Sequence, residues 1–317
     1  MNLEYYPKEK YKDYVYLNGS RQLPIFIAVE NGIKPMMDDW ILLDKYSSFK
    51  KMCKKYKLKI IADWIFFKVE EKLIQQSQDS NRLNTTKFYG IPFSEEVRIE
   101  GGSVHIFISK SEENIINAKK CGWYPLIVNK RSLHKPFIDH LRFGKVLGYP
   151  ECCINFYRNF NNHLIYNNIY ETYKNTPDKM NYLCNCLFMD FTYSLIHHIP
   201  CSFNCERTID YAKKVLEEIE REEPKFAKEI KHYLTLPALV FDEKDTYVFE
   251  GKIEGNNLKY DSFTFLGRDE DDKYSNLLTR ANNLKVYETK IDLFNKKKLI
   301  GNIKKNKPEN GFLLKFE

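Results

Sequence analysis

The spacing of apolar positions changes along the 317-residue chain, and these changes predict three parts. Residues 1–130 mix short apolar runs with helical spacing, which is typical of α/β structure. Residues 131–236 follow a mostly helical pattern, whereas residues 237–317 alternate in the manner of strands separated by turns. We therefore predict an α+β fold with an α/β domain, a helical cysteine-rich segment and a small antiparallel β-rich domain over these three ranges.

Within the first part, the apolar spacing from Asp39 to Lys57 predicts an amphipathic helix. The run from Ile60 to Phe67 is interpreted as a strand or the start of a buried helix, because a short apolar run fits both. The polar stretch from Gln75 to Thr86 is rich in residues that break regular structure, and it predicts a surface loop or an insertion.

A strand, a helix and a second strand are predicted next. Val104 to Ile108 is the first strand, and Ser109 with Glu112 three residues later forms a capping-box pattern. The helix that this pattern opens extends to Cys121, and Pro125 to Val128 is the second strand. This order predicts a βαβ unit and hence some parallel sheet.

A helix start in the middle part carries two adjacent cysteines. Pro150 fits the first position of a helix that runs to Asn161, because its ring fixes a helical φ and it lacks the N–H group. Cys152 and Cys153 then lie in the first turn of this helix.

A second helix start carries another two cysteines. The apolar spacing from Thr208 to Glu222 predicts a helix that Ser202 or Asn204 can cap. Cys201 and Cys205 lie just before it and in its first turn. A helix N-terminus lowers the pKa of a thiol and favours bound anions, so two such ends suit thiolate ligands.

Two further helices are predicted in this part, over Ser132 to Leu147 and over Tyr182 to Ile196. The second is mostly apolar and is therefore expected to be buried. Cys184 and Cys186 lie in it and point to different faces, where a cysteine is more often a small core residue than a ligand.

The N-terminal sequence and the clustered cysteines together indicate the cellular compartment and the chemistry of the thiols. Six of the eight cysteines lie between residues 148 and 207. The residues from Met1 to Asp13 have neither the apolar region nor the small-residue cleavage site of a secretory signal, so we place the protein in the cytoplasm. Disulfides rarely persist there, and clustered cysteines therefore indicate metal binding or redox chemistry.

Charge adds little to the functional assignment. The formal net charge is +7, and basic runs occur from Lys50 to Lys59 and from Lys296 to Lys307. A solvated helix face and a loop explain these runs at least as well as a nucleic-acid patch, so nucleic acid is kept only as a possible partner. The longest apolar runs are far too short to span a membrane, and no membrane partner is expected.

The cysteine spacings favour an unusual metal site. None of the pairs has the Cys-x-x-Cys spacing with which zinc sites usually begin. Adjacent helical residues point roughly 100° apart, so Cys152 and Cys153 are expected to suit a larger cluster better than one small ion. A pair of reactive thiols for thiol exchange is a third alternative.

His198 is a further candidate ligand, because it stands three residues before Cys201. A histidine at this place could instead cap the carbonyl groups at the end of the preceding helix. Other catalytic patterns are absent from the sequence, including the P-loop, Gly-x-Gly-x-x-Gly, His-Glu-x-x-His and Gly-x-Ser-x-Gly.

Two motifs carry a resemblance to a known family. They are Phe143-Gly-Lys-Val-Leu-Gly-Tyr-Pro150-x-Cys152-Cys153 and His198-x-Pro200-Cys201-Ser202-x-x-Cys205-x-x-Thr208. Together with the block from Phe107 to Asn114 they resemble a mainly archaeal family known as domain of unknown function 483, over roughly residues 85–266. The family implies no activity, but the resemblance points to the same four cysteines and to His198.

The leading hypothesis from the sequence is a metal-binding protein whose ligands are Cys152, Cys153, Cys201 and Cys205, with His198 as an additional candidate. A [4Fe–4S] cluster in an enzyme of redox or sulfur-transfer type is favoured. One alternative is a zinc-stabilised, non-catalytic module that binds RNA or a protein partner. The other is a metal-free enzyme that depends on its thiols. The sequence names no substrate and no catalytic residue.

Overall fold

The contacts of the chain divide it into two units, Tyr6–Leu164 and Met1–Tyr5 with Ile165–Glu317. Helices and antiparallel sheets occur in both, so the predicted α+β class is confirmed. The structure, a computed structural model, describes residues 4–7, 9–68, 88–97, 101–123, 127–128, 131–132, 137–161, 167–189, 191–242, 245–267 and 272–317. No helix within these ranges combines the length and the apolar character that a membrane span requires. The predicted loop from Gln75 to Thr86 lies outside them.

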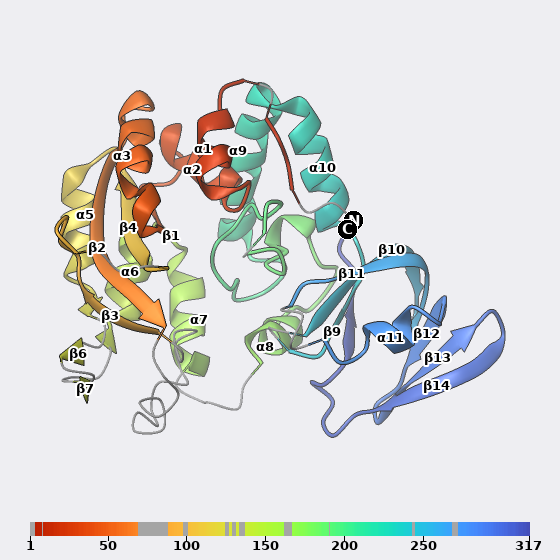
Figure 1. Cartoon of the computed structure of the whole chain (residues 1–317). Helices are drawn as coiled ribbons and strands as arrows, with labels where there is room; N and C mark the ends of the chain where they lie inside the picture. Colours follow the sequence, from red (N-terminus) through yellow and green to blue (C-terminus); the bar gives the residue numbers. More distant parts are fainter. Residues whose placement is uncertain are drawn as a thin grey trace. The chain divides into compact units, whose positions relative to one another are not determined.

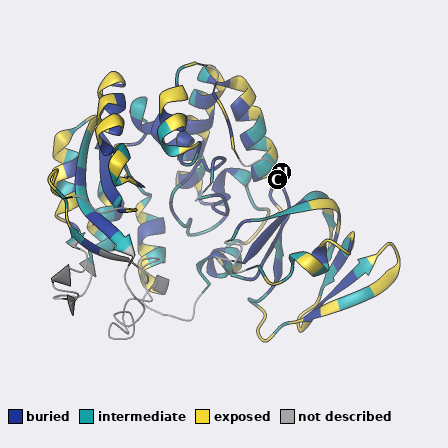
Figure 2. Ribbon diagram, in the orientation of Figure 1, coloured by how far each residue is buried: buried dark blue, intermediate teal, exposed yellow. Residues whose placement is uncertain are grey.

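The unit Tyr6–Leu164 is built on a four-stranded antiparallel sheet in the order β1-β4-β2-β3 (Figure 1). Its strands are β1 (Met36–Leu42), β2 (Lys59–Lys68), β3 (Phe88–Pro92) and β4 (Ser103–Ser109). Six of the seven residues of β4 are buried, because this central strand is covered on both faces (Figure 2). Of the two interpretations of Ile60–Phe67, the strand is correct, and the strand predicted at Val104–Ile108 is confirmed.

Helices cover this sheet. In chain order they are α1 (Lys12–Asn18), α2 (Leu23–Glu30), α3 (Tyr46–Lys55), α5 (Glu112–Lys119), α6 (His140–Val146) and α7 (Glu151–Asn161). One buried cluster joins Met36 of β1 and Phe107 of β4 to Ile115 and Ala118 of α5 and to Leu147, which directly follows α6. This cluster attaches the end of α6 to the sheet.

The predicted βαβ unit is wrong. The described residues of the predicted second strand, Pro125–Val128, form β6 (Ile127–Val128), which pairs antiparallel with β7 (Arg131–Ser132) in a separate sheet. β5 (Gly122–Trp123), which follows α5 directly, pairs antiparallel with β8 (Phe137–Ile138) in another. β4 already has β1 on one side and β2 on the other, both antiparallel. No place beside β4 is therefore left for a parallel strand that returns after α5. The helix N-cap is Ser111, not Ser109.

Strand pairing also replaces part of two predicted helices. Asp39 to Leu42 belongs to β1, which pairs with β4 along its whole length, and the helix begins only at Tyr46 after the 3-10 turn η1 (Leu43–Lys45). In the segment predicted as a helix from Ser132 to Leu147, β7 (Arg131–Ser132) pairs with β6 (Ile127–Val128) and β8 pairs with β5, so α6 starts only at His140. Cross-strand pairing outweighs the intrinsic helical pattern at these positions.

The predicted helix from Tyr182 to Ile196 is wrong as well. Only a 3-10 turn, η3 (Tyr182–Cys184), forms there, and turns follow it. The side-chain oxygen of Asn181 accepts from the N–H of Leu183, and that of Asn185 accepts from the N–H of Leu187. These local bonds compete with the helical hydrogen-bond pattern. The prediction that most of this segment is buried is correct.

The second unit combines helices with a seven-stranded antiparallel sheet in the order β14-β13-β12-β11-β10-β9-β15. Its helices are α8 (Asn168–Lys174), α9 (Glu206–Glu222) and α10 (Pro224–Leu234), and α9 confirms the helix predicted from Thr208. The sheet confirms the predicted small antiparallel β part, which also contains the four-residue helix α11. Their bounds are β9 (Ala238–Val240), β10 (Thr246–Glu254), β11 (Asn257–Phe265), α11 (Ser275–Leu278), β12 (Asn283–Val286), β13 (Lys290–Asn295), β14 (Lys298–Lys304) and β15 (Phe312–Leu314).

The N-terminal residue Tyr5 packs in this same unit. Its ring is stacked on Phe226 of α10 with centroids 4.1 Å apart. Its hydroxyl donates a hydrogen bond of 2.8 Å to the buried carboxylate of Glu223. The unit therefore contains two stretches of chain, with residues 6–164 between them.

A sharp corner joins α6 to α7. The N–H of Gly148 donates to Lys145 O at 3.0 Å and that of Tyr149 to Gly144 O at 2.9 Å, which is the pair of bonds of a Schellman motif. Gly148 has φ of +76°, and a Cβ there would lie 2.6 Å from the ring of Pro35. Only glycine satisfies both conditions. α7 then begins at Glu151, one residue after Pro150, which was predicted as its first residue; the predicted helix from this corner to Asn161 is confirmed.

Lys34 holds this corner from the other side. Its side chain is only 3% exposed, its Nζ donates to the carbonyl oxygen of Leu147, and it lies 4.4 Å from the centre of the Tyr149 ring. Burial lowers the pKa of Lys34 to about 7, and the nearby charge of Asp38 opposes this shift.

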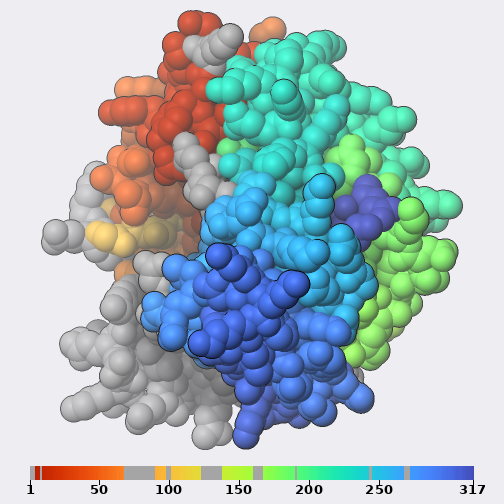
Figure 3. Space-filling model, turned by 90° about the vertical axis from the view of Figure 1, so that its right-hand side faces the viewer, coloured from red at the N-terminus to blue at the C-terminus, as the bar shows by residue number. Residues whose placement is uncertain are grey.

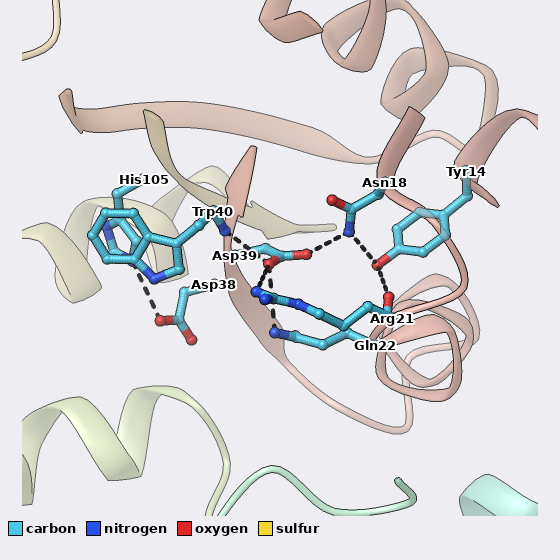
Figure 4. A network of polar contacts seen from close by, with 8 residues as sticks. All are labelled: Tyr14, Asn18, Arg21, Gln22, Asp38, Asp39, Trp40 and His105. Carbon is cyan, nitrogen blue, oxygen red and sulfur yellow. Dashed lines mark hydrogen bonds and ion pairs between the residues drawn. The ribbon is translucent and has the colours of Figure 1, made fainter. Parts of the chain in front are cut away.

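A buried carboxylate fastens α1 and α2 to β1 (Figure 4). Asp39 is 1% exposed and accepts hydrogen bonds from Asn18 Nδ2 at 2.7 Å, Arg21 at 3.0 Å and Gln22 Nε2 at 3.4 Å. It also accepts from the backbone N–H of Trp40 at 2.7 Å. Such a buried charge is stable only while its donors are in place.

We predict that Asp39→Ala lowers the free energy of unfolding by about 3 kcal/mol, because the buried Gln22 and the partly buried Asn18 and Arg21 lose their shared acceptor. Urea unfolding followed by circular dichroism measures this. The matched control is Asp44→Ala, at an exposed aspartate, which should change the free energy by less than about 0.5 kcal/mol. Equal effects of the two substitutions would contradict the structural role of Asp39.

A second prediction concerns pH. Because the pKa of folded Lys34 lies near 7 and its ordinary value is 10.5, the unfolded chain binds more protons than the folded chain between these values. The free energy of unfolding should therefore rise from pH 7 to about pH 9, by about 2 kcal/mol more in the wild type than in Lys34→Met. Urea unfolding at both pH values tests this, and parallel curves would show that Lys34 keeps an ordinary pKa.

Candidate metal centre

The first cysteine pair lies at the start of α7. Pro150 O accepts from the N–H groups of Cys153 at 2.9 Å and Ile154 at 3.0 Å, so the helix begins with a regular turn. Cys153 is buried and Cys152 is partly exposed. Their Sγ atoms are 3.9 Å apart. The predicted place of both residues in the first turn is confirmed.

This distance corrects the expectation that adjacent helical cysteines point too far apart for one small ion. Each thiol turns about a single torsion, and the two sulfur atoms of Cys152 and Cys153 approach each other despite the 100° between successive residues. Four sulfurs placed tetrahedrally at about 2.3 Å from zinc lie about 3.8 Å from one another. The observed separation matches one edge of such a tetrahedron.

The second pair lies in the segment that enters α9, and polar side chains at the end of α8 hold its backbone. The donor–acceptor pairs are Thr172 Oγ1 to Pro200 O at 2.8 Å, Asn175 Nδ2 to Cys201 O at 2.6 Å and Phe203 N to Thr176 Oγ1 at 2.9 Å. The fully buried ring of Phe203 packs edge-on against Phe316. Cys201 is therefore presented from a backbone that is fixed on both sides.

Cys205 is the N-cap residue of α9, and its carbonyl oxygen accepts from the N–H of Ile209 at 2.9 Å. Its Sγ lies within 4.8 Å of the Sγ of Cys201. The predicted caps Ser202 and Asn204 are wrong, because the Ser202 hydroxyl instead accepts from the N–H of Asn204 in the turn before the helix.

His198 is buried, and its Nε2 lies 3.0 Å from the hydroxyl oxygen of Thr208 in α9. This hydrogen bond ties the segment before Cys201 to the helix after Cys205. Thr208 is fully buried, so the bond is shielded from water.

The remaining cysteines are core residues by their surroundings. Cys53, Cys121, Cys184 and Cys186 are all buried. Burial raises the pKa of Cys53 to about 12, and burial followed by the charge of Cys205 raises the pKa of Cys184 further. Cys121 Sγ donates to Asn117 O at 3.2 Å, and Cys184 Sγ lies 3.8 Å from Cys205 O. The raised pKa values of Cys53 and Cys184 keep these two thiols protonated, and a protonated thiol is a poor metal ligand.

Each of the two cysteine pairs thus offers two thiols of the kind with which proteins hold metal ions: Cys152 with Cys153, and Cys201 with Cys205. The first two belong to the unit Tyr6–Leu164 and the other two to the second unit. Each pair stands at the N-terminus of a helix, α7 or α9, where the helix dipole favours negatively charged sulfur.

Sequence reasoning missed the residues that position these cysteines. Thr172, Asn175 and Thr176 form a polar stripe at helical spacing, and this stripe is the signal that could have indicated a contact with another segment. The burial of Lys34 could not be predicted from the sequence, since an isolated lysine is normally interpreted as exposed.

The comparisons with known proteins agree with this focus. No curated protein and no solved structure is significantly similar to the chain. Residues 103–235 match the model of one family, described as a protein of unknown function (DUF483). The matched stretch contains the Gly148–Cys153 motif and the His198–Thr208 motif, so the resemblance seen in the sequence is confirmed over residues 103–235.

Proposed function

We propose that Cys152, Cys153, Cys201 and Cys205 bind one metal ion tetrahedrally, that this ion is zinc, and that the protein is a zinc-stabilised module in which the metal is structural. The observation that carries the proposal is the 3.9 Å between the sulfur atoms of Cys152 and Cys153, which fits the edge of a ZnS₄ tetrahedron. The distance limit of 4.8 Å between the sulfurs of Cys201 and Cys205 is compatible with a second edge.

The same distance argues for a single ion over the [4Fe–4S] cluster that the spacing in the sequence favours. In such a cluster each thiolate binds a different iron atom at a corner of a cube, which holds the sulfurs farther apart than around one ion. Two sulfurs at 3.9 Å suit one shared metal. We therefore place zinc before iron and sulfide.

Electrostatics supports four thiolates in this setting. Four thiolates and one Zn²⁺ carry a net charge of −2, which must be compensated if the site is shielded from water. The partial positive charges at the starts of α7 and α9 supply part of this compensation.

That the two pairs form one site is part of the proposal, since they belong to different units. The extent of the family match supports it, because one family model spans both motifs. The exclusion of the other four cysteines supports it too: each is buried, and none offers a second thiol pair at a helix start.

Four protein ligands leave zinc no open position for water or substrate, which is the usual mark of a structural site. We therefore assign the four thiols to the fold and not to thiol exchange or redox catalysis. Bound zinc would then contribute directly to the free energy of folding.

Metal analysis tests this proposal. Protein purified without oxygen should contain one zinc per chain, without iron or acid-labile sulfide. Zinc should fall to near zero in Cys152→Ser/Cys153→Ser and equally in Cys201→Ser/Cys205→Ser, because either pair alone supplies only half of the ligands. Two independent sites would instead leave about half of the metal in each variant.

The matched control is Cys121→Ser, at a buried thiol that donates to a backbone carbonyl, and it should keep the full zinc content. Brown protein that contains iron and sulfide would contradict the zinc assignment and support an iron–sulfur cluster. Wild-type protein without any metal would sink the proposal and leave a thiol-dependent activity as the better hypothesis.

A second test concerns His198, which the sequence predicts as an additional ligand. Four thiolates already complete the zinc shell, and Nε2 of His198 shares a hydrogen bond with Thr208, so we assign this histidine to positioning. His198→Ala should keep one zinc per chain and lower the free energy of unfolding by about 1–3 kcal/mol. Zinc content and urea unfolding together check this, and loss of zinc at unchanged fold would make His198 a ligand.

A further inference from the structure

Nearly all of the net charge of the chain is concentrated in one short stretch. Residues 285–307 contain eight lysines and two acidic residues, a net charge of +6, whereas the whole chain carries +7. This stretch includes strands β13 and β14 and the turn between them. The rest of the protein is almost neutral, so the charge is a local feature.

The fold collects these lysines on the outer part of the seven-stranded sheet. β14 is an edge strand of this sheet, and β13 and β12 follow it. Leu284, Ile291, Leu293 and Ile303 point into the hydrophobic core, so the alternate residues lie on the opposite face. Figure 3 shows the surface of this C-terminal part in blue.

Lys285, Tyr287, Lys290 and Lys304 occupy that opposite face or its continuation. Lys290 is directly opposite Lys304 across β13 and β14. Like charges placed opposite each other destabilise a sheet, so this arrangement works against the fold. Lys296, Lys297 and Lys298, all exposed, add three more charges at the turn between the same strands.

Acidic neighbours compensate little of this charge. Asp292 is ion-paired with Lys290 at 2.8 Å, and Glu309, just after the stretch, is ion-paired with Lys307 at 3.9 Å. Lys285, Lys298 and Lys304 have no carboxylate within ion-pair distance in the part of the chain that the structure describes. The basic run of α3 differs, because Lys50 and Lys55 are paired with Glu95 and Asp13.

An aromatic ring lies within this basic face. Tyr287 is 37% exposed, and the Nζ atoms of Lys285 and Lys290 lie 5.4 Å and 5.3 Å from the centre of its ring. Lys305 Nζ donates to the carbonyl oxygen of Tyr287 at 3.1 Å. An accessible ring between ammonium groups is the arrangement on which a nucleic-acid base stacks while adjacent phosphates meet lysines.

We propose that this face of β12, β13 and β14 binds single-stranded nucleic acid, with Tyr287 stacking on a base and Lys285, Lys298 and Lys304 contacting phosphates. Single strands are favoured over duplexes because a base must be unpaired to stack on the ring. A nucleic acid is favoured over an anionic membrane because the ring stands between ammonium groups and not in an apolar patch.

Fluorescence anisotropy of full-length protein with labelled oligouridine or oligothymidine of about 15 nucleotides tests the proposal. The wild type should bind at low salt, and log affinity should fall linearly with log salt concentration. Lys298→Ala/Lys304→Ala should weaken binding at least tenfold and reduce the slope by about 1.4, which is about 0.7 for each phosphate that a lysine no longer neutralises. Its fold should be retained, because removal of Lys304 relieves repulsion with Lys290.

The matched control removes the same charge elsewhere. Lys51→Ala/Lys54→Ala changes two exposed lysines of α3 and should leave affinity within about twofold of the wild type. An equal weakening of binding in the two double variants would overturn the proposal, since net charge alone would then explain binding.

Tyr287 separates stacking from charge. Tyr287→Ala should weaken binding about tenfold with an unchanged salt slope, whereas Tyr287→Phe, which keeps the ring, should bind like the wild type. Failure of the wild type to bind either oligonucleotide would overturn the proposal. So would binding to phosphatidylserine vesicles that the oligonucleotides do not compete away, because the face would then serve a membrane surface.

Discussion

The absence of a side chain at Gly148 is the constraint on which the first half of the candidate metal centre depends. The residue needs a left-handed φ to end α6, and the ring of Pro35 fills the space that a Cβ would occupy. Buried Lys34 holds the carbonyl just before it. α7 can therefore leave the corner in one direction only, and the sulfurs of Cys152 and Cys153 are carried to neighbouring positions.

The second cysteine pair is positioned by other means. The side chains of Thr172 and Asn175 bond to the backbone around Cys201, and His198 bonds to Thr208 beyond Cys205. These are hydrogen bonds between segments far apart in sequence. A pair of this kind depends on the packing of its unit, whereas the first pair depends largely on local backbone geometry.

This difference explains what the sequence could predict. The start of α7 was predictable because Gly-Tyr-Pro is a local signal with a single structural meaning. The strand β4 was predictable because a strand covered on both faces is a nearly continuous apolar run, here Val104 to Ile108 with His105 inside it. The βαβ unit was not, since the pairing of β4 with both β1 and β2 is decided by distant residues. The apolar segment from Tyr182 to Ile196 has helical spacing, but the side chains of Asn181 and Asn185 bond to nearby backbone N–H groups, and turns form there instead of the predicted helix. The sequence was enough to identify the candidate cysteines. The distance between the sulfurs of Cys152 and Cys153 could not be predicted, because it depends on side-chain torsions as well as on sequence spacing.

The stacking of Tyr5 on Phe226 has a consequence for how the chain is made. Residues 6–164 form a unit inserted between the first residues and the rest of the other unit. During synthesis, residues 6–164 leave the ribosome before α10 is made, so this unit can fold before Tyr5 is able to stack on Phe226. The two stretches of the unit that contains Tyr5 are separated in sequence by residues 6–164, which can already be folded. This unit is therefore completed in a late step, after the ribosome has produced α10 and the sheet that follows.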